Sequence, residues 1–285
     1  MVQLKKLANE RFSALICIDS FNERIRLDDY SGRVRDVIQS VLQEAAACKA
    51  SKVIVKVRRE HVPLFLEKGF RLEGVFSHYF LGSDAYGMSL FLTEDRMNSP
   101  YWLKEDEMVA SIQEKQVKKD QIAWQDEYVM RKAEPKDIHK LAKLYDTVFE
   151  TYPTPMNESD YIQKVMEEGT IFYVVEHDGH IVSAASAEIN APYGHAELTD
   201  CATLPSYRKL GFMHHLILAL EKELQSMHIY VFYSLARALS YGMNQVFYQL
   251  GYTYTGRFQN NCYIFDKIED MNLWVKTPNH EMVLI

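Results

Sequence analysis

The sequence predicts a mixed α/β fold, in which helices pack against a sheet that contains both parallel and antiparallel neighbours. Two observations lead to this prediction. Strand-like apolar runs alternate with amphipathic helical segments along most of the 285 residues. The pair Asp178–Gly179 between two such runs is typical of a hairpin turn, so some neighbouring strands are antiparallel. An apolar fraction of 47% is enough for a sizeable core.

Residues 1–95 form the first part of the chain. Four runs rich in β-branched and aromatic residues predict strands, at 13–19, 52–57, 70–80 and 86–92. Apolar side chains that recur every three or four residues predict helices at 34–45 and 60–68. Residues 28–33 (DDYSGR) have the composition of a turn.

Residues 128–285 continue the alternation in a second part. The same patterns predict strands at 128–132, 171–177, 180–190, 197–203, 229–235, 252–258 and 262–275. They predict helices at 137–149, 161–168, 213–227 and 241–250. Residues 96–127 are dense in charge and poor in apolar side chains, so we expect a connector there that places one helix on the surface.

An internal repeat relates the two parts. Residues 65–76 (FLEKGFRLEGVF) and 247–258 (FYQLGYTYTGRF) both fit F-x-x-x-G-[FY]-x-x-x-G-x-F, with an offset of 247 − 65 = 182. The pattern indicates a helix stopped by glycine, an aromatic side chain that enters the core, and a strand. We interpret this as a duplication, in which the first part corresponds to the back half of the second.

Composition excludes several classes of protein. With 32 basic and 39 acidic residues the net charge is −7, so we expect no nucleic-acid partner. Four widely spaced cysteines without a CxxC pair argue against a disulfide scaffold or zinc ribbon, and no metal site is expected. The N-terminus has no signal-peptide pattern, and no apolar run approaches the length of a membrane span. We therefore expect a cytoplasmic protein without a membrane partner.

Residues 197–224 carry the most informative motif. A strand ends, a proline fixes the chain, Arg208 and Gly211 follow, and a helix begins. Such a turn directs backbone N–H groups and the positive end of a helix dipole at one point, which suits a pyrophosphate. Gly211 permits close approach of a ligand, and Arg208 can add charged hydrogen bonds. An ordinary strand-to-helix turn with a solvated arginine is the alternative.

The stretch LPSYRKLGFM resembles the acetyl-CoA loop of the GNAT N-acetyltransferases, [RQ]-x-x-G-x-[GA], with Met213 in place of the final small residue. The resemblance covers roughly residues 128–276. It implies a GNAT fold preceded by a partial, GNAT-like half-domain, with acetyl-CoA as cosubstrate. The residues expected to contact acetyl-CoA are Cys201, Ala202, Thr203, Arg208, Lys209, Leu210, Gly211, Phe212 and Met213.

Longer stretches in both parts are similar to the β-lysine N6-acetyltransferases. They are SDAYGMSLFLTEDR (83–96), FETYPTPM (149–156), ASAEI (185–189), AELTDCATLPSYR (196–208), ARALSYGMN (236–244) and LGYTYTGRFQNNCYI (250–264). This resemblance implies acetyl transfer to the terminal amine of β-lysine, which yields the compatible solute N6-acetyl-β-lysine.

The reaction needs a base, because a lysine-type ammonium has a pKa of about 10.4 in water. Glu197 is the candidate general base, directly or through water, and Asp200 is expected to hold the substrate. The leaving thiolate also needs a proton. The family's tyrosine for this step corresponds to Phe247, so Tyr248 is the first candidate, with Tyr241 or solvent as alternatives.

Charge matching predicts the rest of the substrate site. Arg237 can pair with a carboxylate and Glu188 with an ammonium. Tyr152 is expected to form a wall over the amine, and Asn260 to supply an amide contact.

The first part contains nothing like R-x-x-G-x-G, so we expect it to close the substrate cleft or to form a homodimer interface. Acetylation of another small amine and non-catalytic binding of acyl-CoA are the competing functions.

Overall fold

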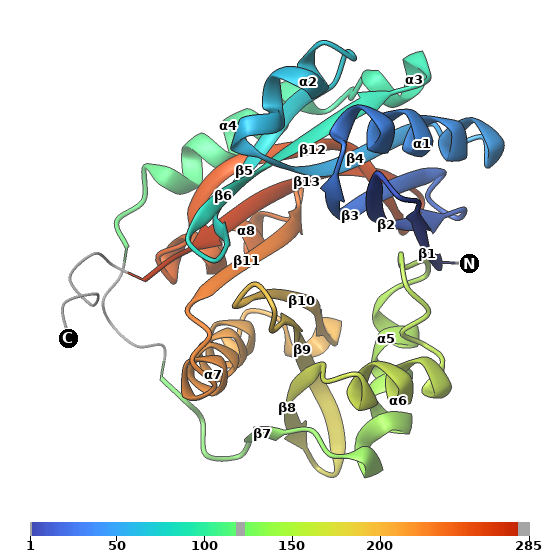
Figure 1. Cartoon of the computed structure of the whole chain (residues 1–285). Coiled ribbons are helices and arrows are strands. Elements are labelled where there is room, and N and C mark those ends of the chain that lie inside the picture. Colours follow the sequence, from blue (N-terminus) through green and yellow to red (C-terminus); the bar gives the residue numbers. More distant parts are fainter. Residues whose placement is uncertain (1, 118–122, 279–285) are drawn as a thin grey trace, which may run out of the picture.

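The computed structural model describes residues 2–117 and 123–278, so part of the predicted connector lies outside the described residues. Its strands form one 13-stranded sheet in the order β1-β2-β3-β4-β6-β5-β12-β13-β11-β10-β9-β8-β7 (Figure 1). The mixed α/β prediction is confirmed, because the pairs β3–β4 and β10–β11 are parallel within an otherwise antiparallel sheet. No helix in the described ranges combines the length and apolar character needed to span a membrane.

The first part holds six strands and two α-helices. Its elements are β1 (Val2–Ala8), β2 (Phe12–Asp19), β3 (Arg24–Gly32), α1 (Val34–Ala47), β4 (Lys52–Arg58), the 3-10 turn η1 (Arg59–His61), α2 (Val62–Leu66), β5 (Arg71–Phe80) and β6 (Ser83–Phe91). The connector contains α3 (Glu94–Met97) and α4 (Trp102–Gln113).

The second part adds seven strands. Its elements are β7 (Val129–Lys132), η2 (Pro135–Asp137), α5 (Ile138–Val148), α6 (Ser159–Glu167), β8 (Ile171–His177), β9 (His180–Asn190), β10 (His195–Thr203), η3 (Pro205–Tyr207), α7 (Phe212–Ser226), β11 (Val231–Arg237), α8 (Tyr241–Gln249), β12 (Thr253–Ile264) and β13 (Lys267–Lys276).

Three details of the predicted elements were wrong. Residues 2–8 form an edge strand that the sequence analysis left unassigned, since its side chains are largely exposed and carry no apolar alternation. Most of the predicted turn at 28–33 belongs to β3, which has a bulge opposite Leu15 and Ile16. The last two strands turn at residues 265–266, because the asparagine-rich segment 259–261 is a bulge within β12.

The internal repeat becomes a pseudo-two-fold arrangement. Read outward from the β5–β12 junction, the sheet order β5-β6-β4-β3-β2-β1 in one part mirrors β12-β13-β11-β10-β9-β8 in the other. The repeat's second glycines, Gly74 and Gly256, are paired residues of β5 and β12. The repeat's last phenylalanines, Phe76 and Phe258, have ring centroids 5.8 Å apart.

Glycine is required at this junction. Gly256 has φ +152°, and a Cβ there would lie 2.1 Å from the Glu73 carbonyl oxygen and 2.4 Å from the Gly74 Cα. The two strands therefore approach too closely for any side chain at this position.

The sheet curls strongly, so strands distant in its order face one another (Figure 1). Tyr79 on β5 and His195 on β10 have ring centroids 3.8 Å apart, although three strands separate β5 from β10. A shared core fills the concave face near the junction. Both parts contribute to it: Ile54, Phe76, Tyr79, Ala85, Tyr233, Phe258, Cys262, Ile264, Met271, Leu273 and Val275.

The connector is anchored to β12 by buried polar contacts. The Asn260 side-chain amide donates to the carbonyl oxygens of Asp95, Arg96 and Asn98 at 3.0–3.2 Å. Arg257 on β12 pairs with Asp106 on α4 at 2.9 Å. These contacts hold α3 and α4 against the second part.

Candidate active site

The candidate site begins where β10 separates from β11. The two strands pair only from His195 to Glu197, opposite Val231 to Tyr233. Beyond that point β10 bulges away, with a register shift between Thr199 and Ala202 against β9. Asp200 lies in this bulge with φ +49°, a left-handed conformation that is uncommon for a residue other than glycine. The bulge opens the sheet and turns polar groups toward the gap.

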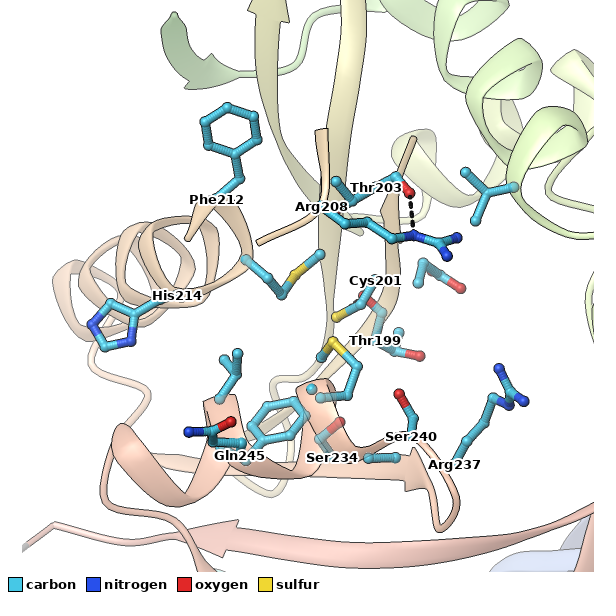
Figure 2. A pocket seen from close by; sticks show the side chains of 18 of the residues that line it. Thr199, Cys201, Thr203, Arg208, Phe212, His214, Ser234, Arg237, Ser240 and Gln245 are labelled. Atoms are coloured by element: carbon cyan, nitrogen blue, oxygen red, sulfur yellow. Dashed lines mark hydrogen bonds between the residues drawn. The ribbon is translucent and has the colours of Figure 1, made fainter. Parts of the chain in front are cut away.

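A cavity of about 1130 Å³ fills the gap between these strands. The bulge, the start of α7, the end of β11 and one side of α8 form its walls. In Figure 2, Thr199 and Cys201 of β10 lie opposite Ser234 and Ser240, and Arg237 lies at one end. The cavity is large enough for an extended cosubstrate together with a small acceptor.

One end of the cavity is built for an anion. Gly211 has φ +82° and caps α7, whose first turn opens into the cavity. Within the described residues, the amides of 209–213 donate to no backbone carbonyl. The Arg208 side chain also lines the cavity, where its Nε donates to the Thr203 carbonyl oxygen at 3.3 Å (Figure 2). Available amides, a helix N-terminus and a guanidinium fit a diphosphate.

Most of the residues predicted to contact acetyl-CoA meet at this cavity: Cys201, Thr203, Arg208, Lys209, Gly211, Phe212 and Met213. Ala202 and Leu210 are not among the residues that line it. Ala202 is buried in the core between the sheet and α5, and Leu210 packs against the core beside α7. Their side chains therefore support the loop from behind.

Asp200 is the polar centre of the other end. One carboxylate oxygen accepts from the Ser186 hydroxyl at 2.6 Å and the other from the Tyr152 hydroxyl at 3.2 Å. The Tyr145 hydroxyl donates to the Asp200 carbonyl oxygen at 2.7 Å. Burial raises the pKa of Asp200 to about 6, although the bonds from Ser186 and Tyr152 oppose the rise. Asp200 and Tyr152, both predicted to contact substrate, line the cavity, and the contact itself stays a prediction.

Glu188 and Glu197 lie side by side next to this centre. They are directly paired positions on β9 and β10, and neither lines the cavity itself. Glu188 is solvent-accessible yet surrounded by protein on most sides. Desolvation, together with the carboxylates of Glu197 and Asp200, raises the pKa of Glu188 to about 8. Glu188 therefore holds its proton more firmly than an exposed glutamate does.

The structure does not support Tyr248 as the acid for the thiolate. Its hydroxyl donates to the carbonyl oxygen of Gln113 at 2.7 Å, at the end of α4, and the residue does not line the cavity. Phe247 occupies the cavity side of α8, because adjacent helical residues point about 100° apart. Tyr241 is also absent from the lining.

The two remaining predicted contacts have different outcomes. Arg237 lines the cavity, pairs with Glu269 at 2.8 Å, and retains a buried Nε without a partner among the described residues. Asn260 is 3% exposed, and its amide is used by the connector, so the predicted substrate contact there is wrong. The sequence around Asn260 does not predict this burial, because its partners lie more than 160 residues earlier in the chain.

Sequence reasoning missed three residues at the Asp200 end of the cavity, where the amine that accepts the acetyl group would bind. Ser186 orients Asp200, and Phe149 and Phe265 line the cavity beside Arg237. The Arg237 guanidinium lies 4.6 Å from the Phe265 ring centroid. Ser186 was detectable, since it faces Thr199 and shares the face of Glu188. Phe265 was not, because the position of the last turn was predicted wrongly.

Comparisons with known proteins agree with this geometry. The model of the acetyltransferase (GNAT) family matches residues 137–252. The N-acetyltransferase YodP of Bacillus subtilis is 39% identical over 275 residues, which cover 96% of this chain and 99% of that protein. Beta-lysine N(6)-acetyltransferases of Methanococcus maripaludis and Methanosarcina mazei are 35% and 34% identical, covering 92% and 87% of this chain and 96% and 99% of theirs.

The fold and the site therefore define an acetyl-CoA-dependent N-acetyltransferase. The chain belongs to the GNAT acetyltransferase family. The match to the Bacillus subtilis protein covers 96% of the chain, so it includes the N-terminal part.

Proposed function

We propose that the protein transfers the acetyl group of acetyl-CoA to the terminal amine of β-lysine and forms N6-acetyl-β-lysine. One observation carries the proposal: a single cavity connects the anion-binding turn at Gly211 with the buried carboxylate of Asp200. The names of two relatives that match almost the full chain support β-lysine as the amine. The product would then serve as a compatible solute.

The geometry favours Asp200 over Glu197 as the group that takes the proton. Asp200 lines the cavity, and a pKa of about 6 leaves it ionised at neutral pH but still basic. Its two hydrogen bonds, from Ser186 and Tyr152, fix the carboxylate in place. Glu197 lies outside the cavity lining and is assigned to substrate binding instead.

Each step of the transfer has a balanced course. The terminal ammonium of the substrate gives one proton to Asp200, and its nitrogen then attacks the thioester carbonyl carbon. The new C–N bond forms as the C–S bond breaks, and the electron pair leaves on sulfur. The acylated nitrogen still carries two hydrogens and a positive charge, and it loses one proton to solvent to give the neutral amide. Because Phe247 stands where a tyrosine would donate, solvent protonates the thiolate.

Release of free thiol from acetyl-CoA tests the substrate. Purified protein is mixed with acetyl-CoA and β-lysine, α-lysine or spermidine, and the acetylated nitrogen of the product is located by NMR. We expect rapid release with β-lysine, at least 10-fold slower release with the other amines, and acetylation at N6. Equal rates with all three amines, or no release with β-lysine, would contradict the proposal.

A further inference from the structure

The N-terminal part presents charged side chains to the concave face of the sheet. On β3, Ile25 and Leu27 face the core beneath α1, so the alternate residues Arg26 and Asp28 face the opposite side. On β4, Lys56 alternates in the same way with buried valines. The three groups form a loose cluster, with Arg26 Nε 3.5 Å and Lys56 Nζ 3.9 Å from one oxygen of Asp28.

The curl of the sheet places this cluster opposite the carboxylates of the catalytic part. Lys56 Nζ lies 5.2 Å from the Tyr79 ring centroid and 5.9 Å from that of Tyr233. Tyr233 is the β11 partner of Glu197, and their side chains lie close enough to interact electrostatically. The positive charges of Arg26 and Lys56 act on Glu188 across the same space.

The charged groups in this space are placed better for binding a ligand than for stabilising the fold. Glu188 and Glu197 are direct cross-strand neighbours, which is unfavourable for like charges, and neither has an ion pair within the described part of the chain. His195, stacked on Tyr79, is 2% exposed, and neither ring nitrogen has a hydrogen-bond partner in the described ranges. Arg26 and Lys56 share a single acidic partner, Asp28, so together the three groups keep a positive charge that Asp28 does not balance.

We propose that this space is the binding subsite for the zwitterionic head of the substrate, with Lys56 and Arg26 holding the carboxylate and Glu188 and Glu197 holding the adjacent ammonium. The inference rests on the proposed function and names the role of the N-terminal part in it. That part closes the site and supplies the positive charges that select an amino acid over a simple diamine.

The spacing fits a β-amino acid whose other amine lies at Asp200. Ser186, which binds Asp200, and Glu188 are two residues apart on β9, or roughly 6.6 Å along a strand. In β-lysine four carbons separate the two amines, which gives a similar extended length. One methylene group separates the carboxylate from the carbon that bears this second amine, so the carboxylate would reach toward β3 and β4.

A double-mutant cycle that combines one change in the protein with one change in the substrate tests the subsite. Lys56→Met keeps the side-chain stem against the aromatic rings but removes its charge. β-Lysinamide keeps both amines but lacks the carboxylate. We expect either change alone to raise KM at least 10-fold with little effect on kcat. Together they should raise KM no further than one change does, because both remove the same interaction.

Controls separate the subsite from folding and from the proposed function. Arg59→Gln, an exposed position on η1, should leave KM for both compounds unchanged. Should Lys56→Met fail to fold, Arg26→Gln replaces it, since 42% of the Arg26 side chain is exposed. Additive losses in the cycle would overturn the subsite while acetylation of β-lysine stands. If the wild type does not acetylate β-lysine, the proposed function is overturned. The subsite is then tested by titrating β-lysine into the wild type and into Lys56→Met. Equal affinity of the two proteins would overturn the subsite.

Discussion

At the scale of single residues, the proposed proton transfer depends on the surroundings of Asp200 in the β10 bulge. Its carboxylate is buried, which favours the neutral form, and two hydroxyl groups donate to it, which favours the charged form. The balance leaves a pKa of about 6, close to the value that suits a general base at neutral pH.

The first prediction concerns the pH dependence of the reaction. Only ionised Asp200 accepts a proton, so kcat/KM should fall as the pH drops through about 6. Asp200→Asn should lower kcat by roughly 10²–10⁴-fold and remove this inflection. Ser186→Ala should move the inflection to higher pH, because it removes a bond that stabilises the charged carboxylate. Steady-state kinetics between pH 5 and 8 give both results, and an inflection that survives in Asp200→Asn would assign it to another group.

At the scale of elements, the corresponding strand-to-helix connections of the two parts differ in length. In the second part, residues 204–211 separate β10 from α7 and leave amides available at the cavity. In the first part, α1 begins at Val34, directly after β3, so no comparable loop exists between them. The same order of elements therefore forms the turn at the cavity in one part and supplies charged strands in the other.

The junction between β5 and β12 yields a prediction for stability. Gly256→Ala places a methyl group against the Glu73 carbonyl and the Gly74 Cα, so the free energy of unfolding should fall by about 3 kcal/mol. Gly242→Ala on α8 is the matched control. Its Cβ meets no atom within 4 Å, and alanine favours a helix by up to about 1 kcal/mol. Urea denaturation measures both, and equal stability of the two variants would show that the junction tolerates a side chain.

At the scale of the whole molecule, the two parts share one sheet and a common core cluster. The sheet is continuous across the junction, and the concave core takes side chains from both sides of it. The parts also meet at a second place, where the Tyr193 hydroxyl of the β9–β10 loop donates to Asp29 at 2.8 Å and receives a bond from Arg58 at 2.9 Å. This second contact holds the curled sheet closed around the proposed head-group subsite.

Cooperative unfolding follows from this continuity. Phe76→Ala, in the first part, should lower the stability of the entire chain by about 3–5 kcal/mol, because Phe76 is 2% exposed and packs on Phe258 and Tyr233. Circular dichroism and tryptophan fluorescence should report the same single transition. Leu66→Ala, at a 52% exposed position, should change little. Two separate transitions would show that the parts fold independently.

The sequence by itself determined the order of most elements, the duplication and the anion-binding turn. Each of these depends on local rules: apolar periodicity, glycine at helix ends, and a glycine-capped helix that follows a strand. Local patterns also selected Asp200, inside the predicted strand 197–203, and Arg237, just after the predicted strand 229–235, and both line the cavity. They failed for residues 2–8, whose exposed edge strand has no periodic pattern.

Only the tertiary structure decided what the side chains face. Tyr248 and Asn260 have suitable chemistry, but α4 and the connector occupy their polar groups. Lys56 and Arg26 lie more than 130 residues from Glu188 and Glu197 in the sequence, and only the curl of the sheet brings them together. That curl brings strands far apart in the chain into contact, which no local sequence rule encodes.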